Sequence, residues 1–238
     1  MSQNRQLFSA QQQAFEKDYR LLLIDLPGHG ESSDMSGPYG LVEFAAAIEA
    51  AMDSVGITCA HFWGTHLGAG AGLLLAARSA ARFKTLILEG PVFPGKPLPA
   101  VASVLDNVRR AAREQGMNEA KKVWFNHSQW FAIMREHPEE CRAQEQWQIV
   151  SQFQGAPWLD TGLVSPIDNI DDKLATLTIP TLIINGEHDL SDFLDVADQL
   201  ERALAHCERA SIIGGGGFPL WEYPEPVNTI VRDFMLGL

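Results

Sequence analysis

One short stretch constrains the fold of this chain more than any other. It reads Phe-Trp-Gly-Thr-His-Leu-Gly-Ala-Gly over residues 62–70, with an apolar run, 59–63, before it and a helix-like run, 69–78, after it. Its closely spaced glycines allow a strand to turn sharply and a helix to pack tightly behind it. The pattern predicts a strand–turn–helix in which His66, at the tip, adopts a strained backbone and points into a cleft.

Composition limits the class of protein and its partners. The 238 residues are 46% hydrophobic and 20% charged, which is enough for one large α/β domain with its own core. The net charge of −12 argues against nucleic acid or an anionic membrane as a partner. The three cysteines form no C-x-x-C pair and no metal-ligand spacing, which favours a reduced, cytoplasmic compartment. The first ten residues are polar and do not form a signal peptide, and no apolar run is long enough to span a bilayer.

Apolar runs and helical patterns alternate along most of the chain. Short apolar runs bounded by turn residues predict buried strands at 19–25, 59–63, 83–89, 180–185 and 210–213. Apolar residues at helical spacing predict helices at 1–18, 41–55, 69–78, 193–205 and 226–238. This alternation predicts an α/β fold with a mostly parallel sheet and helices on both faces.

The stretch 98–168 interrupts the alternation, because it is helical, rich in aromatic residues and without a strand signal. Its aromatic residues are either the core of a helical insertion or the lining of a cap over a small-molecule pocket. A position between two core strands favours the cap. The chain then divides into a first core part, 1–97, a helical cap, 98–168, and a second core part, 169–238. The pocket candidates are Phe93, Trp124, Trp130, Trp147 and Trp158.

From Tyr19 to Leu238 the chain resembles the α/β-hydrolase fold family. In that family the sharp turn reads G-x-S-x-G, and the loop after strand four reads D-x-x-G-x-G-x-S, which residues 25–32 match throughout. The G-x-x-D at 186–189 and the terminal helix add to the resemblance. Together these motifs are specific for the fold and much less specific for its chemistry.

The resemblance implies a catalytic site with altered residues. His66 stands at the nucleophile position, Asp189 at the acid position, and Gly217 where the family carries its histidine base. The backbone N–H of Leu67 would be one oxyanion donor. A His66–Asp189 dyad acting as a general base is one possibility. A metal site of His66, His188 and Asp189 has no supporting ligand spacing, so we expect neither a metal nor a cofactor.

The resemblance also implies that the fold is truncated at its N-terminus, without the family's first three strands. The family's third strand lies between those that correspond to 21–25 and 59–63, so their backbone groups would lose a shared neighbour. Three explanations stay open: the sequence is a fragment or starts late, a partner chain donates the strand, or the two flanking strands close up. We prefer the first, and the incomplete sheet is compatible with a homo-oligomer.

Two functions follow from these observations. The first is a hydrolase of a small, apolar, ester-like substrate, in which His66 and Asp189 carry altered acid–base chemistry. The second is a non-catalytic small-molecule-binding or regulatory protein that keeps the pocket and has lost the triad. In both cases the partner is a small molecule, and serine-type hydrolysis is not expected.

Overall fold

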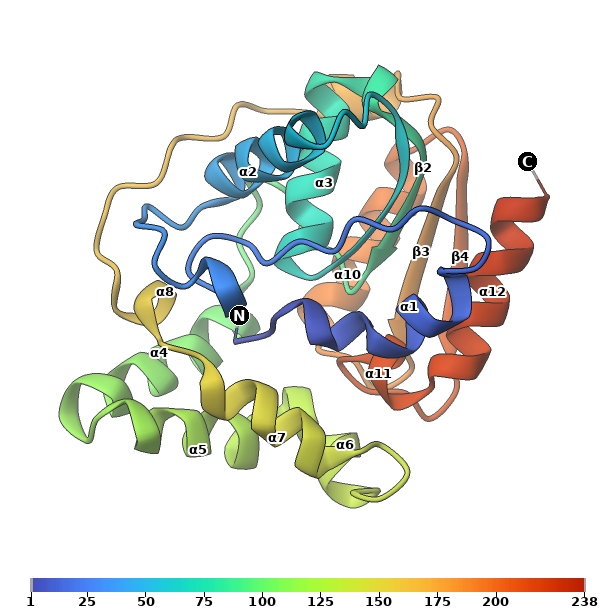
Figure 1. Ribbon diagram of the computed structural model, residues 1–238. Coiled ribbons are helices and arrows are strands. Elements are labelled where there is room, and N and C mark those ends of the chain that lie inside the picture. The colour runs from blue at the N-terminus through green and yellow to red at the C-terminus, as the bar shows by residue number, and fades with distance from the viewer. Residues whose placement is uncertain (1, 238) are drawn as a thin grey trace.

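The centre of the molecule is a parallel sheet of four strands. In the computed structural model, which describes residues 2–237, the strand order is β1-β2-β3-β4 (Figure 1). The strands are β1 (Ala60–Thr65), β2 (Phe83–Glu89), β3 (Thr181–Gly186) and β4 (Cys207–Ile212). Every neighbouring pair is parallel, with Gly64 opposite Leu88 and Ile87 opposite Leu182. The predicted parallel sheet is confirmed.

Helices cover both faces of this sheet, as the sequence predicts. One face carries α2 (Leu41–Ser54), α3 (Leu67–Arg78) and α10 (Ser191–Ala203), and the other carries α1 (Ser9–Phe15) and α12 (Pro224–Leu236) (Figure 1). Successive side chains of a strand point to opposite faces. Accordingly, Leu86 and Leu88 pack in the cluster that contains α3 and α10, whereas Ile87 packs in the cluster that contains α1 and α12.

A helical insertion separates β2 from β3. It contains α4 (Pro99–Glu114), α5 (Met117–His127), α6 (Ala132–Glu136), α7 (Ala143–Gln152), α8 (Ala156–Leu159) and α9 (Asp171–Ala175). Figure 1 shows α4 to α7 as a separate layer beyond one end of the sheet. The remaining short helices are η1 (Arg5–Phe8), η2 (Gly30–Ser32), η3 (Ala80–Arg82), η4 (Gln129–Phe131) and α11 (Pro219–Glu222). No helix within residues 2–237 is both long and apolar enough to cross a membrane.

The strand predicted at 19–25 is wrong. Residues 20–26 are extended without belonging to the sheet, and Leu21 and Leu22 keep 38% and 36% of their surface exposed. Within residues 2–237, no backbone hydrogen bond involves the N–H or C=O groups of 20–25. A strand requires a neighbour at about 4.8 Å, and β1, the nearest edge of the sheet, lies across a cavity from this segment. The two segments therefore do not close up.

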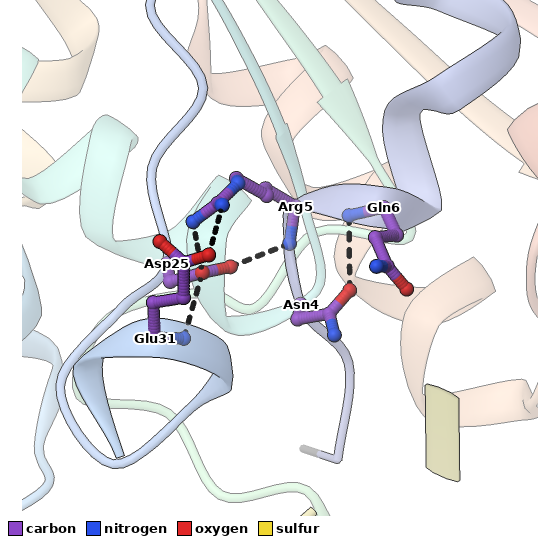
Figure 2. A network of polar contacts seen from close by, with 5 residues as sticks. All are labelled: Asn4, Arg5, Gln6, Asp25 and Glu31. Carbon is purple, nitrogen blue, oxygen red and sulfur yellow. Dashed lines mark hydrogen bonds and ion pairs between the residues drawn. The ribbon is translucent and has the colours of Figure 1, made fainter. Parts of the chain in front are cut away.

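A buried carboxylate fixes the far end of the extended segment (Figure 2). The Asp25 side chain is 4% exposed and accepts hydrogen bonds from Arg5 N at 2.6 Å, Arg5 Nη1 at 2.8 Å and Glu31 N at 3.0 Å. Arg5 Nη2 also pairs with Glu31 Oε1 at 2.6 Å. This network connects η1 to the loop over 25–32, so the extended segment is held in place although no strand pairs with it.

Candidate functional site

The turn between β1 and α3 has the geometry that the sequence predicts. His66 lies between them at φ 48° and ψ −112°, a conformation that costs about 1–3 kcal/mol in a non-glycine residue. A Cβ atom at Gly64 would lie 2.7 Å from the backbone nitrogen of Ala69, and one at Gly72 would overlap the ring of Phe62. The close approach of α3 to β1 therefore requires these glycines.

The ring of His66 is enclosed by aromatic side chains. The residue is 6% exposed, and its ring centroid lies 4.7 Å from that of Phe193 and 5.0 Å from that of Phe218. The indole N–H of Trp130 donates to His66 Nε2 at 3.1 Å. Because an indole only donates, Nε2 is unprotonated, and Nδ1 carries the proton towards Thr65 Oγ1 at 3.0 Å.

This environment removes the acid–base capacity of His66. Burial lowers the pKa of its imidazole to about 3, so the ring is neutral throughout the physiological pH range. A general base needs a free lone pair within reach of the proton that it abstracts. The lone pair on Nε2 already accepts from Trp130, so His66 behaves as a packed core residue.

Trp130 also fills the space next to Gly217. A Cβ atom at Gly217 would overlap Cδ1 of the indole and would lie 3.0 Å from the carbonyl oxygen of Trp130. The same indole thus contacts both His66 and Gly217, the two positions at which the resemblance implies an altered residue. From the sequence, Trp130 was only a pocket candidate. It lies 64 positions from His66, and no motif connects residues so far apart.

Asp189 lies close to His66 without bonding to it. Its carboxylate is almost fully buried and accepts from Asn185 Nδ2 at 3.0 Å and from Leu190 N at 2.8 Å. Gly90 lies between the two candidates, since a Cβ there would be 3.0 Å from the His66 ring and 3.3 Å from Asp189 Oδ2. No hydrogen bond joins His66 to Asp189 in the described part of the chain. Burial raises the pKa of Asp189 to about 7.

Two further buried carboxyl groups lie nearby that sequence reasoning missed. Glu89 Oε2 accepts from Leu220 N at 3.1 Å, and Glu222 Oε2 accepts from Gly216 N at 2.6 Å. The Oε1 atom of each has no partner among residues 2–237. Burial raises the pKa of Glu222 to about 7 and that of Glu89 well above its usual range. A single glutamate at the end of a strand, like Glu89, or of a short helix, like Glu222, carries no sequence signal of such burial.

The main cavity lies beside β1 and not under the insertion. Its volume is about 500 Å³, and its walls are the segment 19–26, β1, residues of α1 and α2, and the turn at 65–68, including His66 and Leu67. Within the described chain, residues 98–168 contribute nothing to its lining. The predicted pocket residues Phe93, Trp124, Trp130 and Trp158 are at most 5% exposed and lie in the hydrophobic core, and Trp147 packs partly buried against Phe125.

No metal site accompanies these groups. Among residues 2–237, no group of three or more His, Cys, Asp or Glu residues is arranged to hold a metal ion. His188, considered with His66 and Asp189, has a side chain that is 58% exposed and lies near the carboxylate of Glu187.

Comparison with known proteins identifies the family. The alpha/beta hydrolase fold family matches residues 2–120, which is half of the chain. The chain belongs to the α/β-hydrolase fold family.

Individual relatives of this α/β-hydrolase family member are distant. It is 23% identical to 3-oxoadipate enol-lactonase 1 of Acinetobacter baylyi, over 98% of this chain and 84% of that protein. Among solved structures, the enol-lactonase from Burkholderia xenovorans superposes with a TM-score of 0.80 at 22% identity, covering 99% of this chain and 88% of that one. A thermophilic esterase from Thermogutta terrifontis superposes with a TM-score of 0.79 at 20% identity, covering 99% and 86%. At these identities the superpositions show the fold alone.

The buried carboxyl groups give this family member a predicted pH dependence of stability. A carboxyl group with a raised folded-state pKa binds more protons in the folded state, so its contribution is present below the unfolded-state pKa, near 4, and is lost as the pH rises to about 7. We expect Glu222→Gln to gain stability relative to the parent over this window, by up to about 1.4 kcal/mol per pH unit. Urea unfolding at several pH values measures the difference.

The control for this prediction is Glu225→Gln, which changes an exposed glutamate at the start of α12. Its stability relative to the parent should not vary across the same window. A Glu222→Gln profile parallel to that of the parent would show that the Glu222 carboxyl group is not protonated in the fold.

Proposed function

We propose that this α/β-hydrolase family member binds an apolar ligand in the cavity beside β1 and does not hydrolyse it. The observation that carries the proposal is the position of Trp130, whose indole N–H uses the lone pair of His66 and whose ring fills the space next to Gly217. Nucleophilic hydrolysis requires an activated nucleophile with a base in contact. The side chain at the nucleophile position is the imidazole of His66, which is neutral and enclosed by aromatic side chains.

The alternative, hydrolysis by altered chemistry, has weaker geometric support. The names of the relatives favour it, since they include a lactonase and an esterase. Asp189, with a pKa of about 7, has the acidity of a general base. However, Asp189 is buried and does not line the cavity, whereas His66 and Leu67 do. One oxyanion donor without a nucleophile supports binding rather than turnover.

The proposed binding site is apolar and accessible. Leu21, Leu22 and Trp63 line it without being fully buried, and Phe8 of η1 and Phe15 of α1 also line it. Apolar pockets of several hundred Å³ are typical of small-ligand sites. The proposal also places the protein in the cytoplasm, because all three cysteines are free thiols. Nucleic acid and membranes are not proposed as partners, because the net charge is −12.

An esterase assay tests the absence of turnover. With p-nitrophenyl butyrate and with an aliphatic lactone, we expect the purified protein to produce no more product than buffer, and His66→Ala to behave identically. An authentic enol-lactonase serves as the positive control. Saturable turnover that is abolished by His66→Ala would contradict the proposal and restore the enzymatic interpretation.

A dye titration tests the binding site. We expect 1-anilinonaphthalene-8-sulfonate to bind saturably and Leu22→Asp to weaken that binding by at least about tenfold, because an apolar contact of the cavity wall is replaced by a negative charge that repels the anionic dye. Leu163→Asp is the matched control, since Leu163 is 95% exposed and lies outside the cavity lining. If the dye bound both variants with equal affinity, its binding site would lie outside this cavity.

A further inference from the structure

One side of the molecule exposes apolar side chains that its own fold leaves uncovered. Residues 159–166, which begin at the last residue of α8, are all exposed, and those after Leu159 belong to no helix or strand. Leu163 keeps 95% of its surface exposed and Val164 keeps 53%. Met35, in the loop before α2, is 51% exposed. Apolar side chains that gather on a protein surface mark interaction sites.

Two segments that are far apart in the sequence form this surface. A Cβ atom at Gly40 would lie 2.8 Å from Cβ of Val164. The N–H of Ser165 donates to Glu43 Oε1 of α2 at 3.0 Å. Figure 1 shows the chain after α8 running past α2 along one side of the molecule. The loop before α2 and the segment after α8 therefore lie side by side, and neither lines the cavity beside β1.

The charge around this surface is of one sign. Residues 21–77 and 143–172, which include both segments, contain 11 of the 30 Asp and Glu residues and none of the 18 Lys and Arg residues. The other 19 acidic residues nearly balance the 18 basic ones, so these two ranges carry almost all of the net charge of −12. Among residues 2–237, Asp34 and Asp160 take part in no ion pair. The acidic apolar surface consists of Met35, Leu159, Leu163, Val164, Asp34 and Asp160.

We propose that the acidic apolar surface binds a basic amphipathic helix of a partner protein. Charge selects the partner, because Lys and Arg side chains beside an apolar stripe would pair with Asp34 and Asp160. An acidic partner or an anionic membrane would be repelled. This surface is separate from the cavity beside β1, so the proposal goes beyond the binding function proposed above and does not depend on it.

The surface offers a partner side chains rather than a row of backbone groups. The N–H of Gly162 donates to Asp160 Oδ1 at 3.1 Å, that of Ser165 is taken by Glu43, and Pro166 has no N–H. An added strand requires free backbone donors and acceptors along an edge, and these residues interrupt such a row. A helix instead lays its apolar stripe on apolar side chains and places its charged residues beside that stripe.

A designed helix tests the proposal with the whole protein. The probe is fluorescein-Leu-Lys-Lys-Leu-Leu-Lys-Leu-Leu-Lys-Lys-Leu-Leu-Lys-Leu-amide, and its control has Glu at every Lys. We expect fluorescence anisotropy to show saturable binding of the probe and no binding of the control. Leu163→Ser should weaken binding by about tenfold, because a leucine contact is lost. Asp160→Asn, which keeps an acceptor for Gly162, should weaken it by about two- to fivefold, and this difference should shrink in high salt.

Matched variants elsewhere on the surface control for general effects. Ile213→Ser changes an 85% exposed residue just past β4, and Glu225→Gln changes an exposed residue of α12, which covers the opposite face of the sheet from α2. Neither should alter the affinity for the probe. Dye binding in the cavity beside β1 should be the same in all four variants, because none of the four positions lines that cavity.

Several results would overturn the proposal. Among these are a probe that does not bind, equal binding of the basic and acidic helices, and equal affinity of the probe for Leu163→Ser and Ile213→Ser. A dimer of the protein alone, seen by sedimentation and lost in Leu163→Ser, would assign the surface to a second copy of this chain and would also overturn it. These results would leave the binding function of the cavity intact.

Discussion

Trp130→Ala is expected to lower the free energy of unfolding by about 3–5 kcal/mol and to raise the pKa of His66 towards its ordinary value. Trp130 is 5% exposed and packs against Trp124 at 4.9 Å, Phe193 at 5.3 Å and His66 at 5.5 Å between ring centroids. Removing the indole leaves a cavity and admits water to His66. Urea unfolding measures the first effect, and an NMR titration of the imidazole measures the second.

Trp130→Phe is the matched control, because it keeps most of the ring volume and loses the N–H donor. We expect it to cost about 1 kcal/mol, the typical net contribution of one hydrogen bond, and to change the pKa of His66 less than Trp130→Ala does. If Trp130→Ala left both the free energy of unfolding and the pKa of His66 nearly unchanged, the indole would not be what keeps His66 in its neutral form.

Gly217→His, which introduces a histidine where the resemblance implies the family's base, is expected to destabilise the fold without creating activity. Its Cβ would overlap the indole of Trp130, and overpacking of this kind costs about 1–3 kcal/mol or more. The substitution should cost less in the Trp130→Ala background, where the space is free. A double-mutant cycle of unfolding free energies measures this coupling.

Gly68→Ala is the control for the addition of a methyl group near the turn. A Cβ atom at Gly68 meets no atom within 4 Å, so the change should alter stability by no more than about 0.5 kcal/mol. If Gly217→His did not lower stability in either the parent or the Trp130→Ala background, the histidine would fit beside Trp130 because the indole moves away readily. The ester and lactone assays should then be repeated on that variant.

The parts of the fold that were predictable are those encoded over short distances. The glycines around His66 dictate a close strand–helix approach, and the G-x-x-D at 186–189 places Asp189 next to Asn185, its hydrogen-bond donor. The helix expected at 41–55 is α2, Leu41–Ser54. Each of these features depends on residues a few positions apart, which a sequence displays directly.

The features that were missed depend on distant neighbours. Residues 19–25 have the composition of a buried strand, but strand formation requires an adjacent strand, and their composition does not show that one is absent. The contact of Trp130 with His66 spans 64 positions, and the bond from Leu220 to Glu89 spans 131. The contact with Trp130 determines which chemistry is open to His66. The motif at the turn does not include Trp130, so the motif alone could not predict that chemistry.

The most direct test of the account is a ¹⁵N NMR titration of His66, assigned by comparison with His66→Ala. We predict a neutral imidazole with its proton on Nδ1 and an unprotonated Nε2 that accepts from Trp130, with no titration between about pH 5 and 8. A pKa near 6.5, or a proton on Nε2, would contradict it. In that case the lone pair of His66 would be free for chemistry, and the hydrolase interpretation would become the better one.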